Sequence, residues 1–403
     1  MKIFYFPSFY PSDRPGEQWL GAFTHRQVKG LMEAGVEVEV VIPVHGYPVW
    51  PFYLLFPDWR RNHQHAHPSE RTFEGVRISH PRVFSPKPNR FFKPYRHYYL
   101  KTATEFIKSR IEDKAETFLF AQWLPEAEMV VSVGKALDIK TAILGIGDDI
   151  LKVPLQSPKH LAGFRYCWEN ADIRGVVADY LGKAANQIYG EDLPYEVFYS
   201  SVNSDEFFPV APVTKNQLRS KYGIDEKKVV LLCVGSPIVR KGWLDLFDAL
   251  SGIDFQNFLL LGVNGGAKEL DLTNEARKRG LSDRFKDVGE VPSAQMNEYY
   301  QISDIFCLPS HWEGLANALL EAMSCSLPVV TTNVSGHPEV VQDGINGFMI
   351  EVGDTVALSN HLLQLMENET LRHQIGQSAC DSIKKIPGTH FDTAKKIIEK
   401  FST

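Results

Sequence analysis

Short apolar runs rich in β-branched residues, separated by helical patterns, constrain the fold of this chain more than any other feature. The run Val229–Gly235 (VVLLCVG) is unbroken and apolar, as expected for a strand that is covered on both faces. Strands that alternate with helices predict parallel sheets in an α/β protein. We interpret as strands the runs Val36–Pro43, Thr141–Leu144, Asp172–Val177, Val229–Gly235, Asn257–Gly262, Ile305–Pro309 and Pro328–Thr332.

The length of the chain, 403 residues, exceeds what one hydrophobic core usually supports, so we expect two domains. Segment 205–216 (DEFFPVAPVTKN) carries two prolines and precedes a second series of strands and helices. The sequence therefore predicts an N-terminal domain over 1–208 and a C-terminal domain over 209–388. A final amphipathic helix within 389–403 is expected to pack back on the first domain.

Composition and cysteine usage point to a cytoplasmic globular protein. Hydrophobic residues make up 44% of the chain and charged residues 23%, which is typical of folded domains. No run of 18 or more apolar residues is present, and the start, MKIFYF, is interpreted as a first strand and not a signal peptide. The five cysteines are scattered, without a C-x-x-C pair, which predicts reduced thiols and no zinc site.

Positive charge is concentrated in one part of an acidic chain. The net charge is −6 overall, yet residues 60–101 hold ten Lys or Arg and two Asp or Glu. Aromatic residues are interleaved through segment 50–101. This composition suits an anionic or lipid-linked acceptor at a membrane surface, and it also suits a carbohydrate acceptor stacked on aromatic rings.

A solvated basic loop remains an equal alternative for that segment. Metal binding by His63, His65 and His67 is disfavoured because no partner ligands accompany them. Nucleic-acid binding is not expected from an acidic chain without a recognisable module. The expected partner is therefore a glycan or lipid-linked acceptor. We expect the protein to attach peripherally to the inner face of the membrane.

The loop and helix after the strand Ile305–Pro309 carry the densest chemical signal. Glu313 and Gly314 stand in the loop, and the helix that follows (ALLEAM) contains Glu321. A helix N-terminus offers unpaired N–H groups to a phosphate, and a glycine lets a ligand approach the backbone. One carboxylate could reach a sugar ring and the other a ribose diol; alternatively, both are ordinary surface charges.

Arg240 and Lys241 lie at a turn between the strand Val229–Gly235 and a helix (GWLDLFDAL). Cations in that position can neutralise a diphosphate leaving group, which is the main electrostatic demand of glycosyl transfer. A solvated basic turn is the alternative for these two residues.

These segments together resemble a known family. The block EGLANALLEAM, Glu313–Met323, resembles the E-x7-E signature of the retaining glycosyltransferases of family 4, the glycosyl transferases group 1. LPVVTTNVSGHPEVVQDGINGF, VGSPIVRKG and FKDVGEVPSAQMNEYYQISDIFCLPS are similar to further motifs of that family. The resemblance is strongest over 229–350. It implies the GT-B fold, in which two Rossmann-like domains face each other across a cleft.

The resemblance also implies roles for individual residues. Glu313 would hold hydroxyls of the donor sugar near the anomeric centre, Glu321 the ribose, Lys241 the phosphates, and Val291 the base. The backbone amides offered to the diphosphate would be those of Gly314, Leu315, Ala316 and Asn317. Family members usually have Arg where this chain has Ser236, so Arg240 is the neighbouring candidate to compensate.

The N-terminal half matches the family less closely. PGEQWLGAFTHRQ places Gly16 or Gly21 where backbone could approach the phosphates. Trp123, with Asp148 and Asp149, resembles the sugar and acceptor side, although Ile146 stands where the family often has His. Since helix ends and cations stabilise the leaving group in this fold, no metal or other cofactor is expected.

The resulting expectation is an enzyme that moves a sugar from a UDP- or GDP-sugar to a glycan or lipid-linked hydroxyl with retention, in cell-surface polysaccharide synthesis. A sugar-nucleotide epimerase or a non-catalytic carbohydrate-binding partner on the same fold are the alternatives. A dinucleotide dehydrogenase is disfavoured because no G-x-G-x-x-G follows the first strand.

Overall fold

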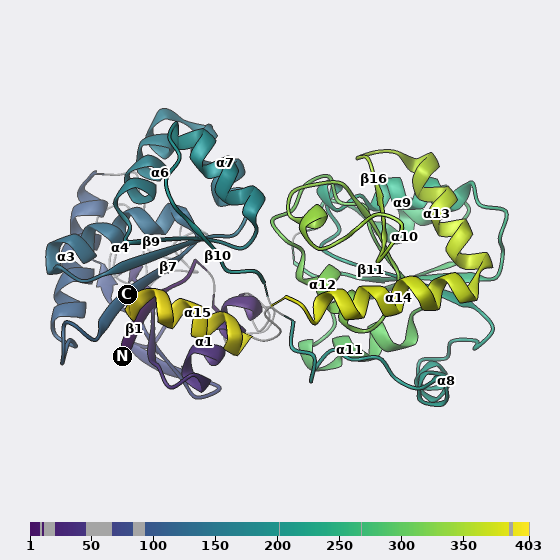
Figure 1. Cartoon of the computed structure of the whole chain (residues 1–403), viewed down its shortest axis with the longest axis horizontal. Coiled ribbons are helices and arrows are strands. Elements are labelled where there is room, and N and C mark those ends of the chain that lie inside the picture. The colour runs from purple at the N-terminus through teal and green to yellow at the C-terminus, as the bar shows by residue number, and fades with distance from the viewer. Residues whose placement is uncertain are drawn as a thin grey trace, which may run out of the picture. The chain divides into compact units, whose positions relative to one another are not determined.

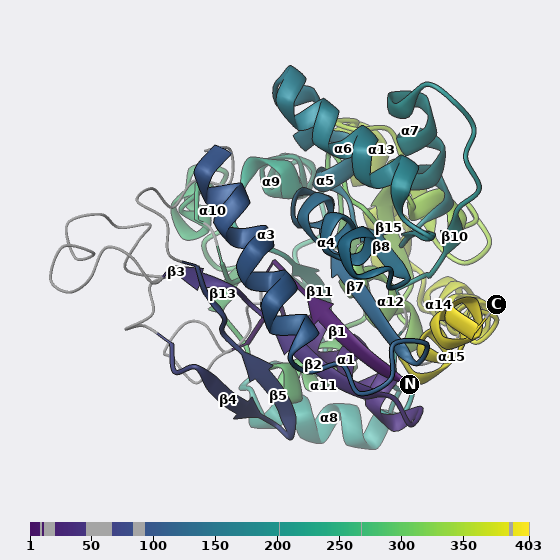
Figure 2. The same cartoon turned by 90° about the vertical axis from the view of Figure 1, so that its left-hand side faces the viewer.

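The computed structural model describes residues 1–403 except for 9, 12–20, 46–66, 84–92, 201, 267, 387–389 and 403. The chain divides into two compact units, each with its own sheet. The first comprises Met1–Phe198 and His390–Thr403, and the second Tyr199–Thr389. The expected α/β class with two Rossmann-like domains is confirmed (Figures 1 and 2).

The first unit is built on a twisted sheet with the strand order β10-β9-β8-β7-β1-β2-β5-β4. All neighbours are parallel except β4 and β5, which form an antiparallel hairpin. In chain order the strands are β1 (Lys2–Phe6), β2 (Glu37–Val41), β4 (Glu70–Phe73), β5 (Val76–Ser79), β7 (Thr117–Gln122), β8 (Thr141–Gly145), β9 (Ile173–Val176) and β10 (Glu196–Val197). A separate parallel pair joins β3 (Val44–His45) to β6 (Arg82–Val83).

Helices cover both faces of this first sheet (Figures 1 and 2). On one face α1 packs against α15, and on the other α3, α4 and α6 pack side by side. The helices are α1 (Ala22–Glu33), α3 (Lys93–Lys108), α4 (Leu124–Leu137), α5 (Asp148–Leu151), η3 (Val153–Gln156), α6 (Pro158–Asn170), α7 (Asp179–Tyr189) and α15 (His390–Ser402). Burial on both faces explains why the interior strands, such as β7, are apolar throughout.

The second unit contains a fully parallel sheet with the strand order β13-β12-β11-β14-β15-β16. Its strands are β11 (Val229–Val234), β12 (Phe258–Val263), β13 (Phe285–Gly289), β14 (Ile305–Leu308), β15 (Val329–Thr332) and β16 (Phe348–Ile350). The run that we predicted to be doubly covered is β11, and five of its six residues are buried.

Two groups of helices enclose this second sheet. The core between the sheet, α9, α10 and α13 is formed by Trp243, Leu246, Phe247 and their neighbours, while α8 packs on α11 and α12 on α14. The helices are α8 (Pro212–Lys221), η4 (Val239–Lys241), α9 (Trp243–Ser251), α10 (Leu272–Lys278), α11 (Ser293–Ile302), α12 (Asn317–Ser324), η5 (His337–Glu339), α13 (Thr355–Glu367) and α14 (Glu369–Ile383). Asp271, Asp354 and Asn368 cap the N-termini of α10, α13 and α14 through their side chains.

The connection between the units lies earlier in the chain than the proline-rich segment suggests. The units divide between Phe198 and Tyr199, whereas the sequence places the boundary near 208. The reason is packing: the Phe207 ring lies 5.7 Å from that of Tyr300, and Ser324 Oγ donates to the Phe207 carbonyl at 2.6 Å. These contacts attach the segment before the prolines to the second unit.

The close approach of two loops in the second unit predicts the effect of one substitution. Gly242 has φ of 69°, and a Cβ there would lie 1.9 Å from the Pro309 carbonyl oxygen. Gly280 has φ of 72° with nothing within 4 Å of a Cβ. We expect Gly280→Ala to cost about 1–2 kcal/mol from backbone strain alone, and Gly242→Ala to cost clearly more. Urea unfolding of both variants tests this, and equal costs would contradict the described approach.

Candidate active site

The predicted site residues of the second unit gather where the strand order of its sheet reverses direction. The chain proceeds from β11 outward to β12 and β13, and then returns to place β14 on the other side of β11. Loops that leave the carboxyl ends of β11 and β14 therefore diverge, and α/β sheets generally bind ligands in the crevice expected at such a point. Arg240 and Lys241 follow β11, and Glu313 follows β14.

Glu313 is the centre of this cluster. Its side chain is 9% exposed, and its Oε1 accepts hydrogen bonds from Lys241 Nζ at 2.6 Å and Ser310 Oγ at 2.8 Å. Arg240 Nη1 lies 3.1 Å from Oε2 and 2.9 Å from the Trp312 carbonyl. The structure thus brings Glu313 together with two cations that lie 72 and 73 positions before it in sequence.

The two cations set the protonation state of this carboxylate. Burial raises the pKa of Glu313, but the charges of Lys241 and Arg240 outweigh it, so the pKa lies below its ordinary value. Glu313 is therefore ionised at neutral pH. One carboxylate faces two cations, which leaves the cluster with an excess positive charge that a phosphate can neutralise.

The loops around Glu313 contain two buried acceptors that have no hydrogen-bond partner among the described residues, His337 Nε2 and Asn317 Oδ1. Thr331 Oγ1 donates to the Leu308 carbonyl, so His337 Nδ1 must donate to Thr331 Oγ1 at 2.9 Å and to the Thr332 carbonyl at 3.2 Å. Burial lowers the pKa of His337 to about 4, which leaves Nε2 as a bare acceptor at neutral pH. Each unpaired acceptor costs about 1–3 kcal/mol, which a site evolved for stability alone would avoid. Sequence motifs did not identify His337.

The segment that precedes α12 presents backbone N–H groups at a helix start. Gly314, Leu315 and Ala316 lead into α12 at Asn317, and no side chain caps the helix. Orphan N–H groups and the positive end of the helix dipole suit an anion. The Gly336 N–H donates to the Gly314 carbonyl at 3.0 Å, so the loop after β15 holds this segment in place.

The remaining predicted donor residues of this unit lie in the same part of the fold. Glu321, in α12, accepts a hydrogen bond from Tyr300 OH at 2.7 Å. Val291 follows β13 and is half-buried. Ser236 follows β11, and its carbonyl accepts from Trp243 Nε1 at 3.0 Å. Ser236 and Val291 thus follow the carboxyl ends of strands, and Glu321 lies in the helix that follows β14.

In the first unit, Trp123 and Asp149 lie at the carboxyl ends of β7 and β8. Asp149 is 1% exposed, and its oxygens accept from the backbone N–H groups of Leu124, Ile146 and Gly147 at 2.7 to 3.2 Å. Its carboxylate is thus committed to shaping these two turns and not open to a sugar. Trp123 has φ of 82°, a strained backbone for a bulky residue.

Two further predicted residues in the first unit lie at the starts of α1 and α5. Asp148 is partly exposed, 4.0 Å from Lys152. Gly21 caps α1 with φ of 80°, a conformation that glycine adopts without strain. Gly16 lies outside the described residues.

Within the described parts of the chain, no group of three or more His, Cys, Asp or Glu side chains is arranged to hold a metal ion. Among the described helices, none is both long enough and apolar enough to cross a bilayer. The five cysteines are free and buried.

Comparison with known proteins relates the second unit to a family of enzymes. Residues 214–381 match the family model described as glycosyl transferases group 1. N-acetyl-alpha-D-glucosaminyl L-malate synthase of Bacillus anthracis is 26% identical over 62% of this chain, and the alignment spans 64% of that protein, just under two thirds. The putative teichuronic acid biosynthesis glycosyltransferase TuaC of Bacillus subtilis is 25% identical, over 83% of this chain and 82% of that protein.

The whole chain also shares its fold with a solved structure. Anabaena Alr3699/HepE, solved in complex with UDP and glucose, superposes with a TM-score of 0.74 at 18% identity, over 100% of this chain and 99% of that one. In sequence over its second unit, and in fold over its whole length, the chain is similar to glycosyltransferases of the GT-B type.

The burial of Asp149 predicts a specific pH dependence of stability. Burial raises the pKa of Asp149 to about 6, against the ordinary 3.8, although its backbone hydrogen bonds partly oppose the rise. The folded state therefore binds this proton more tightly than the unfolded state. The corresponding stability is fully present below about pH 4 and is lost between about pH 4 and 6, to the extent of about 3 kcal/mol.

Urea unfolding of the wild type and of Asp149→Asn between pH 4 and 7 measures this effect. The stability of the wild type relative to Asp149→Asn should fall from pH 4 to 6 and then level off. Asp148→Asn, an adjacent and partly exposed control, should differ from the wild type by a small amount at every pH. A relative stability of Asp149→Asn that is independent of pH would contradict the prediction.

Proposed function

We propose that this protein is a glycosyltransferase that moves a sugar from a nucleoside diphosphate donor, a UDP- or GDP-sugar, to a hydroxyl of a glycan or lipid-linked acceptor. The observation that carries the proposal is the cluster of Glu313, Lys241 and Arg240 at the crevice between β11 and β14. This cluster lies within the residues that match the glycosyltransferase family model. The UDP and glucose bound by the structurally similar Alr3699/HepE support the choice of donor class.

The chemistry follows from the charges at the site. The bond between the anomeric carbon and the diphosphate oxygen breaks, and its electron pair leaves with the diphosphate. Lys241, Arg240 and the start of α12 stabilise this developing charge. The acceptor hydroxyl oxygen forms the new bond to the anomeric carbon, and its proton passes to the departing phosphate oxygen.

Binding of the donor exchanges partners within the cluster. In the structure described here, Glu313 accepts from both cations. A diphosphate would take over part of their positive charge, which frees the carboxylate to accept hydrogen bonds from sugar hydroxyls beside the anomeric carbon. Glu321, already oriented by Tyr300, would accept from the ribose hydroxyls.

Retention of anomeric configuration and a role in cell-surface polysaccharide synthesis are part of the same proposal. The E-x7-E spacing of Glu313 and Glu321 supports retention, since it is the signature of a retaining family. The similarity to TuaC, named for teichuronic acid biosynthesis, supports the polysaccharide role. Analysis of the product by NMR tests both the new glycosidic bond and its configuration.

Substitution of the two glutamates separates their roles. We expect Glu313→Gln to lower kcat by about 100-fold or more at saturating donor, because it acts beside charge that develops in the transition state. Glu321→Gln should mainly raise the donor KM, by about tenfold, because it binds the ground-state ribose. Steady-state kinetics of both variants, after a thermal unfolding check, decide the assignment. Equal losses confined to KM would refute it, and donor binding without any transfer would indicate a carbohydrate-binding protein.

Independence from divalent metal is a second prediction. The described cluster and helix start supply positive charge at the phosphates, so activity should persist in EDTA at the rate measured with magnesium. Rates measured with EDTA, magnesium and manganese test this. If activity is lost in EDTA and restored by either metal, the phosphate charge is neutralised by an ion.

The basic segment 60–101 is proposed to contact an anionic membrane or the lipid-linked acceptor within it, at the inner face of the membrane. Residues 60–66 and 84–92 lie outside the described residues, but Arg96 forms an ion pair with Glu128 and is already neutralised. The cations to test are therefore Arg60, Arg61, Arg90 and Lys93. Each contributes on the order of 1 kcal/mol near an anionic bilayer.

Sedimentation with phosphatidylglycerol vesicles at low salt tests this attachment. The wild type should sediment with the vesicles, and a variant with these four residues changed to Ser should remain in solution while it hydrolyses donor at a normal rate. Wild-type protein that ignores the vesicles would make the segment an ordinary solvated loop.

A further inference from the structure

A polar pocket lies at the amino ends of the strands of the second sheet, whereas Glu313 lies beyond their carboxyl ends. It has a volume of about 480 Å³, within the range of small-ligand sites. Val229, Asp304 and Pro328 line it where β11, β14 and β15 begin. At about 3.3 Å per residue, the length of β11 separates it from the crevice by roughly 20 Å, so the pocket is distinct from the proposed donor site.

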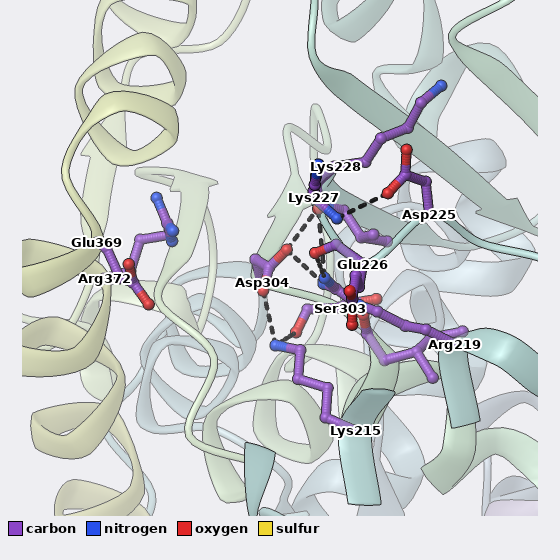
Figure 3. Close-up of polar contacts among 12 residues, drawn as sticks. Lys215, Arg219, Asp225, Glu226, Lys227, Lys228, Ser303, Asp304, Glu369 and Arg372 are labelled. Atoms are coloured by element: carbon purple, nitrogen blue, oxygen red, sulfur yellow. Dashed lines mark hydrogen bonds and ion pairs between the residues drawn. The ribbon is translucent and has the colours of Figure 1, made fainter. Parts of the chain in front are cut away.

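The floor of this pocket is a buried cluster of two cations and one carboxylate (Figure 3). Asp304 accepts from Lys215 Nζ at 2.6 Å and from Arg219 Nη2 at 2.5 Å. The Lys215 ammonium also donates to the Ser303 carbonyl at 2.6 Å. The side chains of Lys215, Arg219 and Asp304 are 25%, 5% and 15% exposed. Arg219 also donates to the carbonyls of Ile302, Glu226 and Lys228. Asp304 is the one carboxylate paired with the two cations, so the cluster has an excess of positive charge.

The pKa of Lys215 responds to its burial and to the neighbouring cations. Burial lowers it, and the charges of Arg219 and Arg372 lower it further, so that it stays below its ordinary value despite contact with Asp304. Asp304 also has a pKa below its ordinary value, because the two cations outweigh its burial. Neighbouring cations thus contribute to both shifts, although burial is the larger cause of the lowered pKa of Lys215.

Two cations on the walls of the pocket carry N–H groups that make no described hydrogen bond. Arg372 extends from α14 on the side that faces Lys215 and Asp304 (Figure 3), and its described hydrogen bonds, to the carbonyls of Leu365 and Met366, use Nη1 alone. The half-buried Lys228 also lines the pocket, and its ammonium has no hydrogen bond or ion pair within the described part of the chain. In total, five Lys and Arg side chains and three Asp and Glu side chains line the pocket, an excess of two positive charges.

We propose that this pocket binds a small phosphate-bearing anion, with Arg372 and Lys228 as its direct ligands and the Lys215–Asp304–Arg219 cluster as its positively charged floor. A phosphate dianion matches the excess of two charges, and its oxygens accept charge-assisted hydrogen bonds from guanidinium and ammonium groups on different walls.

The experiment measures phosphate and pyrophosphate binding by calorimetry and thermal shift at constant ionic strength. It is carried out in a Lys241→Gln background, which weakens the proposed donor site and so separates the two sites. In that background phosphate or pyrophosphate should still bind and raise Tm. Adding Lys228→Gln or Arg372→Gln should weaken the binding by about tenfold or more. Lys385→Gln, which removes an exposed charge elsewhere in the same unit, should leave it unchanged.

Lys228→Gln keeps the test decisive if Arg372→Gln is unstable, because the Lys228 ammonium makes no hydrogen bond or ion pair with the described residues. Binding that is lost with Lys241→Gln alone, or that is unaffected by Lys228→Gln, would overturn the proposal. Binding to phosphatidylglycerol vesicles that Lys228→Gln abolishes, without any response to free phosphate or pyrophosphate, would also overturn it in favour of a lipid phosphate.

Discussion

The ion pairs of Glu313 with Lys241 and Arg240 determine the arrangement of the second unit around its crevice. They join the loop after β11 to the loop after β14, which would otherwise diverge from the point where the strand order reverses. Backbone contacts reinforce the same junction, since the His311 N–H donates to the Arg240 carbonyl at 2.8 Å. The absence of a side chain at Gly242 permits this approach. Removing one partner of such a buried cluster leaves an uncompensated charge, so substitution of any of the three side chains should loosen the contact between the two loops.

Regular strands and local motifs were predictable because their signals are short-range. All seven runs interpreted as strands are strands, with bounds that differ by a residue or two, and MKIFYF is β1. Most of these runs are apolar because both faces of the strand are covered, and this requirement is visible in consecutive residues. The edge strand β4 and its neighbour β5 are among the strands that were not identified: ERTF and VRIS are short, and charged residues interrupt them.

Contacts between distant residues could not be read from the sequence in the same way. Asp149 looked like a polar residue open to a sugar, but its oxygens fold back on three backbone N–H groups. Burial of that kind depends on how β7 and β8 lie side by side, and no local pattern records it. The cluster of Lys215, Arg219 and Asp304 joins positions more than 80 residues apart for the same reason. Tyr300 is a further case, since it lines the polar pocket and also orients Glu321.

The path of α15 has a consequence for how the protein folds during synthesis. This helix packs on α1, and its Phe401 ring lies 4.4 Å from that of Phe118, although the whole second unit separates them in the chain. Lys396 and Lys400 complete the contact by donating to the Val197 carbonyl and the Glu196 carboxylate. The ribosome produces residues 390–402 only after every residue of the second unit. Until then the first unit has all of its strands, but the face of α1 that α15 covers stays exposed.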